Sequence, residues 1–119
     1  MISFDDPEVA KAIRFIRENA VRGIRVSAVH AQSSLSVSML ERRVKKSLGR
    51  TIKAEINRIR MMRAKLLLSE TDLPISEVAK RTGFEETKYF CEVFKKIEGK
   101  TATQFRKPFQ VTSWTDAVL

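Results

Sequence analysis

The sequence has few of the residues that form disulfides, bind metals or break helices. Its 119 residues include one cysteine, one histidine, four glycines and three prolines. A single cysteine excludes a disulfide within the chain, and no cysteine and histidine cluster has metal-ligand spacing, so we expect neither a metal site nor a cofactor. So few helix-breaking residues favour helices over turns and strands.

Long apolar runs and targeting segments are also missing. The longest apolar run is Leu66, Leu67 and Leu68, whereas a helix needs about 20 apolar residues to cross a bilayer. No segment has the pattern of a signal peptide. We therefore expect a soluble protein of the reducing cytoplasm, associated with the nucleoid if it binds DNA, and no membrane partner.

Positive charge is what the sequence has in excess. It contains 23 lysines and arginines against 14 aspartates and glutamates, for a formal net charge of +9. Such a charge attracts polyanions, and charge alone does not choose between nucleic acid and acidic lipid. The abundant alanine, leucine, arginine, lysine and glutamate favour helix, so the predicted fold class is all-α.

An internal repeat organises the chain. The matched positions are 26–29 with 75–78, Leu35 with Phe84, Leu40 with Phe90, Val44 with Phe94, 45–46 with 95–96, and 49–51 with 99–101. One residue is inserted in the second copy, between Phe84 and Phe90. Repeated order of this kind indicates a duplicated unit. The alternative is that unrelated short amphipathic helices ending in Lys-Lys and glycine look alike.

Each copy is predicted to form a short helix, a tight turn and a longer helix, which is the helix-turn-helix arrangement. The stretch from Thr51 to Ser69 contains no proline or glycine, and its apolar residues recur every three or four positions, so we expect one continuous linker helix. We therefore predict about seven helices. They form a first lobe in residues 1–50, a linker helix in 51–70 and a second lobe in 71–108, and a poorly ordered tail follows in 109–119.

The length of the linker helix suits the binding of both lobes to one DNA duplex. A helix of about 19 residues is roughly 28 Å long, close to the ~34 Å between successive major-groove segments on one face of DNA. Two recognition helices held near its ends could enter both segments. Because the copies differ in sequence, we expect an asymmetric site on double-stranded DNA.

The second copy carries a known family signature. Its residues 75–79, 83–84, 89–90, 93–96, 99–101 and 105–106 resemble those of the AraC/XylS family of transcription regulators, and residues 19–26 are similar to its xylose-responsive members. The resemblance covers about residues 9–106. It implies a sequence-specific, two-lobed DNA-binding domain, an effector-binding domain outside this chain, and activation through RNA polymerase. Departures from the family pattern are Val44, Glu55 and Ala102, where the family usually has phenylalanine, an aromatic residue and proline.

In the first lobe the candidate base readers are Ser38, Glu41 and Arg42. They project from the side of the second helix opposite Leu40, and the resemblance places base contacts at all three positions. Arg42 suits guanine, Glu41 suits the cytosine amino group, and Ser38 is permissive. Glu41 is equally well explained as an ion-pair partner of nearby arginines.

In the second lobe the corresponding exposed face carries Thr87, Lys88, Cys91 and Glu92. Lys88 suits a base or a phosphate, and Thr87 suits a thymine methyl or a phosphate. Cys91 is more typical of a small filler than of a reactive thiol. Since Glu92 repels phosphate, we expect this lobe to be the weaker reader.

A further set of residues recurs beside both recognition helices and suits phosphate contacts, which set orientation rather than sequence preference. The set is Ser36, expected also to cap its helix, with Lys45, Lys46, Arg50, Lys95, Lys96 and Lys100. The alternative for the lysines is a solvated surface. His30 has no catalytic or ligand companion in sequence, so we expect it to support packing or the turn.

These patterns predict a DNA-binding regulator and no enzyme, because no acid, base and nucleophile cluster is present. A non-specific architectural nucleic-acid binder is the main rival, which would show salt dependence without a preferred sequence. A protein-interaction or membrane-surface module is a second rival, but the apolar residues leave no obvious insertion face.

Overall fold

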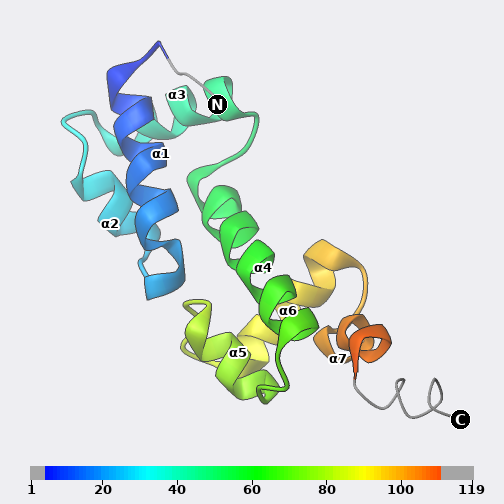
Figure 1. Cartoon of the computed structure of the whole chain (residues 1–119). Helices are drawn as coiled ribbons and strands as arrows, with labels where there is room; N and C mark the ends of the chain where they lie inside the picture. Colours follow the sequence, from blue (N-terminus) through cyan, green and yellow to red (C-terminus); the bar gives the residue numbers. More distant parts are fainter. Residues whose placement is uncertain (1–4, 111–119) are drawn as a thin grey trace, which may run out of the picture. The chain divides into compact units, whose positions relative to one another are not determined.

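The computed structural model describes residues 5–110, and every regular element in that range is helical (Figure 1). In chain order the elements are α1 (Pro7–Asn19), η1 (Ala20–Arg22), α2 (Val26–Ala31), α3 (Val37–Leu48), α4 (Ile52–Glu70), α5 (Ile75–Arg81), α6 (Thr87–Glu98), α7 (Ala102–Arg106) and η2 (Lys107–Phe109). The prediction of an all-α fold with seven helices is confirmed. The tail expected from residue 109 lies outside the described residues, apart from Phe109 and Gln110.

The chain divides into two compact units, and the division falls within α4, between Ile59 and Arg60. Each unit has its own apolar core. The first half of α4 buries Ile56 in one core, and the second half buries Met61 in the other. The spacing of five residues between these two shifts the buried stripe, so each half of the helix serves its own unit.

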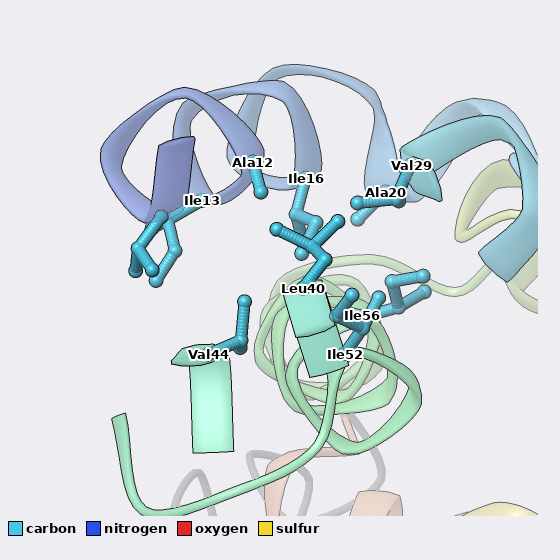
Figure 2. Packing of buried hydrophobic residues seen from close by; sticks show 10 residues of the cluster. Ala12, Ile13, Ile16, Ala20, Val29, Leu40, Val44, Ile52 and Ile56 are labelled. Carbon is cyan, nitrogen blue, oxygen red and sulfur yellow. The ribbon is translucent and has the colours of Figure 1, made fainter. Parts of the chain in front are cut away.

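The core of the first unit is aliphatic. Figure 2 shows side chains from α1, η1, α2, α3 and α4 directed toward a common centre around Leu40. The residues labelled there are Ala12, Ile13, Ile16, Ala20, Val29, Leu40, Val44, Ile52 and Ile56. Leu40 and Val44 are fully buried, so they fix one side of α3 against α1 and leave the opposite side to solvent.

The core of the second unit is built around a row of phenylalanine rings. Phe90 lies 5.4 Å from Phe84 and 5.9 Å from Phe94, measured between ring centroids, and Phe94 lies 5.8 Å from Phe105. The last turn of α4 is tied to α7 because the guanidinium of Arg106 donates to the backbone oxygen of Leu68 at 3.2 Å. These contacts orient α6 within the unit.

The helix ends follow the sequence signals. The carboxylate of Asp6 accepts from the amide nitrogens of Glu8 and Val9 at 3.0 and 3.4 Å, with Pro7 at the first helical position, so Asp6 caps the N-terminus of α1. Gly49 and Gly99 end α3 and α6 in the left-handed conformation, at φ 81° and 79°. A side chain there would be strained.

Candidate nucleic-acid interface

Both units contain a short helix, a tight turn and a longer helix in the same order. The longer helices, α3 and α6, each have 12 residues and end at an equivalent glycine whose amide donates to the oxygen of Lys45 or Lys95. Leu40 in α3 and Phe90 in α6 are both fully buried. The opposite side of each helix is exposed, which is the placement that a recognition helix needs.

The exposed side of α3 carries the first set of predicted base readers. Ser38 and Arg42 are exposed, and Glu41 is half-buried. The hydroxyl of Ser36 accepts from the amide of Met39 at 3.3 Å, so the predicted cap of this helix is confirmed. The amino terminus of α3 is thereby fixed directly before the predicted readers.

Glu41 has a partner that the sequence did not predict. Its Oε2 lies 2.8 Å from Nε2 of His30 on α2. The side chains are 30% and 18% exposed, respectively, so the contact sits at the edge of the predicted reading face. Glu41 therefore pairs with an imidazole and not with the nearby arginines that were considered as its alternative partners.

The exposed side of α6 carries the second set of predicted readers. Thr87, Lys88, Cys91 and Glu92 are all exposed and lie within the first half of the helix. No side chain caps this helix, because Glu86 at the cap position makes no such hydrogen bond. The two predicted reading faces therefore differ both in chemistry and in how their helices begin.

The predicted phosphate contacts divide into two kinds. Lys45, Lys46, Lys95, Lys96 and Lys100 are exposed. Arg50 differs, because it is half-buried and its Nε donates to Oε1 of Glu55 at 2.5 Å. We therefore expect the lysines to reach phosphates freely and Arg50 to be held in place within the first unit.

Glu55 is a fully buried carboxylate at the start of α4. Arg58 binds it through two hydrogen bonds of 2.8 Å, and Arg50 adds a third. Burial alone raises the pKa of Glu55, but the hydrogen bonds from Arg58 and Arg50 outweigh it and hold the pKa below its ordinary value. A triad of ionic groups therefore stands where the resembled family usually has an aromatic residue.

The turn between α2 and α3 is held by a carboxylate from α1. Oε1 of Glu8 accepts from the hydroxyl of Ser33 at 2.7 Å and from the amide of Ser34 at 3.0 Å, and these bonds lower the pKa of Glu8. No non-glycine residue in the described range has a positive φ. Ser34 thus completes its turn without the left-handed backbone that Gly83 uses, at φ 99°.

Two other findings concern the described residues as a whole. Within residues 5–110, no group of three or more histidine, cysteine, aspartate or glutamate side chains is placed to hold a metal ion. Over the same range, none of the helices combines the length and apolar character that a membrane span requires.

Comparisons with known proteins bear on this arrangement. The model of the helix-turn-helix domain family matches residues 30–108. The xylose operon regulatory protein of Escherichia coli (strain K12) is 38% identical over 104 residues, which are 87% of this chain and 26% of that protein. The chain thus spans about a quarter of that relative.

Solved structures of transcription regulators are also similar to this chain. The xylose-binding transcription activator xylR has a TM-score of 0.71 and 36% identity, over 90% of this chain and 28% of that chain. The C-terminal domain of AraT, a response regulator from Geobacillus stearothermophilus, has a TM-score of 0.84 and 31% identity, over 92% and 91% of the two chains.

Proposed function

This chain belongs to the AraC/XylS family of helix-turn-helix transcription regulators, and we propose that it is the DNA-binding part of a longer, sugar-responsive activator. Binding of specific double-stranded DNA sequences follows from the family. Two recognition helices, α3 and α6, insert into successive major-groove segments of one asymmetric operator. The effector-binding domain lies outside this chain, and the bound protein contacts RNA polymerase beside its site.

The repeated helix with one buried and one exposed side is the observation that carries this proposal. α3 and α6 have equal lengths and equivalent glycine ends, and differ in the side chains that they expose. α4 runs for 19 residues, which corresponds to about 28 Å of helix. This length supports a spacing near one turn of DNA, and the unlike reading faces support an asymmetric site.

The similarity to xylose regulators supports a sugar as the signal, and xylose or a related pentose is the class we propose. We propose no catalytic activity on the bound DNA, because the relatives are regulators. The proposed reading faces combine hydroxyl, amine, guanidinium and carboxylate groups, which are suited to base edges. Since bacterial DNA lies in the cytoplasm, we place the protein there, on the nucleoid.

A titration separates this proposal from the rival of non-specific binding. The chain should be titrated by fluorescence anisotropy against a duplex selected from a random pool and against a scrambled duplex of equal length. At physiological salt we expect binding to the selected duplex to be at least about a thousandfold tighter. Equal affinity for both duplexes, with the same salt dependence, would establish the non-specific binder instead.

Arg42 and Lys45 should respond differently to truncation, although both lie on α3. Arg42→Ala removes a proposed guanine contact, so it should cost roughly 1 to 3 kcal/mol on the selected duplex and relax the preference at one base pair. Lys45→Ala removes a proposed phosphate contact, so it should weaken both duplexes equally and reduce the salt dependence by about one ion. Measuring both variants on both duplexes checks the assignment. Identical behaviour of the two variants would refute it.

A further inference from the structure

His30 is the only histidine of the chain, and its side chain contacts a carboxylate. It lies on α2, while its partner Glu41 lies on α3, eleven residues later in the chain. The 2.8 Å separation between Nε2 and Oε2 is that of a well-formed hydrogen bond. Because an ionised carboxylate only accepts, Nε2 carries the proton and donates it.

A carboxylate on a DNA-reading face must overcome repulsion from the phosphates. It contributes to recognition only when it is aimed at a donor on a base edge, and the amino group of cytosine is the donor that glutamate matches best. If nothing fixes a long, half-exposed glutamate side chain, it loses rotamer freedom when it binds a base. It can also turn away from the base toward neighbouring cations such as Arg42 or Lys45. The bond to His30 removes this freedom in advance.

From this geometry we propose that His30 sets base specificity through Glu41: the imidazole fixes Oε2, so that Oε1 accepts a hydrogen bond from cytosine in the major groove. His30 is thus a positioning residue and does not itself touch the base. The inference rests on the proposed function, because it assigns a selecting role to a face that is proposed to read DNA.

The second lobe lacks this device. In the repeat, His30 corresponds to Ala79 and Glu41 corresponds to Cys91. Ala79 is buried and its side chain has no hydrogen-bond donor, and Cys91 is exposed. The second recognition helix also carries a carboxylate, Glu92, which is exposed and makes no hydrogen bond or ion pair within residues 5–110. We therefore expect a carboxylate-dependent cytosine preference from α3 and none from α6.

The test compares the duplexes that each variant selects from a random pool. The wild-type chain is compared with Glu41→Ala, His30→Ala and the double variant that combines them. His30→Gln is added because glutamine retains an N–H donor. Gln32→Ala serves as the matched control, since Gln32 is exposed at the end of the same short helix. Thermal unfolding of every variant reports any loss of folding separately.

We expect the wild type to prefer cytosine about tenfold at one position of the first half-site. Glu41→Ala and His30→Ala should both reduce that preference to about twofold, while the preferences at all other positions remain. The double variant should lose no more than either single variant, because the two groups act as one unit. His30→Gln should restore part of the preference, and Gln32→Ala should leave it unchanged.

Other results would overturn the inference in distinguishable ways. If the wild type selects a site and His30→Ala selects the same site with an undiminished cytosine preference, the positioning role is wrong while the proposed function stands. If His30→Ala weakens all sequences equally, His30 only supports the fold. If the wild type enriches no sequence, the proposed function itself fails.

Discussion

Replacing Phe90 with alanine is expected to destabilise the second unit by about 3 to 5 kcal/mol. Phe90 is fully buried and its ring lies between those of Phe84 and Phe94, at 5.4 and 5.9 Å. Truncation removes the burial of an aromatic ring and leaves a cavity in a closely packed core. Since this row of rings packs α6 within its core, the exposed face that we propose reads DNA should lose its fixed orientation.

Hydrogen exchange of individual amides measures this effect best, because each unit has its own core. In Phe90→Ala we expect protection to fall across α5, α6 and α7 and to persist in α1 and α3. Ile97→Ala on α6 is the matched control, since Ile97 is 48% exposed and should change stability by less than about 0.5 kcal/mol. An equal loss of protection in α1 and α3 would show that the two cores do not fold independently.

Glu55→Ala should produce the second large effect, a destabilisation of the first unit by about 2 to 3 kcal/mol. The substitution removes a fully buried carboxylate and leaves the guanidinium groups of Arg50 and Arg58 without the charge that they bind. Both arginines are more than a third exposed, so they can turn toward water. For this reason the expected loss is below that of a completely enclosed ion pair.

The same substitution should change how stability depends on pH. The pKa of Glu55 is lower in the folded chain than its ordinary value of 4.5, so its stabilising contribution is complete above that value. The contribution is lost as the pH falls through the lower, folded pKa. The difference between the wild type and Glu55→Ala should therefore be largest at neutral pH and should shrink in acid.

Urea denaturation between neutral and strongly acidic pH provides this comparison. Glu18→Ala is a suitable control, because Glu18 is exposed on α1 in the same unit and should change stability by less than about 0.5 kcal/mol. A difference between wild type and Glu55→Ala that stays constant over the whole pH range would contradict a stabilising role for the ionised carboxylate.

Local signals predicted most of the fold. The cap at Ser36 is confirmed. The cap at Asp6 and the glycine ends at Gly49 and Gly99 depend in the same way on residues that are close in sequence. The continuous helix between the copies is also confirmed, at Ile52–Glu70. Helix formation and capping are decided within a few residues, which is why one sequence is enough to predict them.

Contacts between distant residues were not predictable in the same way. The bonds of Glu8 to Ser33 and Ser34 join residues 25 and 26 positions apart, and the pairing of His30 with Glu41 crosses a turn. Helical spacing tells which side of a helix is polar, but it does not tell which polar partner a neighbouring helix brings there. For Glu55, burial follows from packing at a position where charge alone would predict exposure.

The central claim is that α3 and α6 read successive major-groove segments of one duplex. Interference footprinting measures this directly: guanines of a selected duplex are methylated at N7, and the modifications that prevent binding are mapped. We expect two unlike clusters centred about 10 base pairs apart on one face of the duplex, with the first cluster weakened by Arg42→Ala and the second by Lys88→Ala. A single cluster, or two clusters that both respond to Arg42→Ala alone, would contradict it.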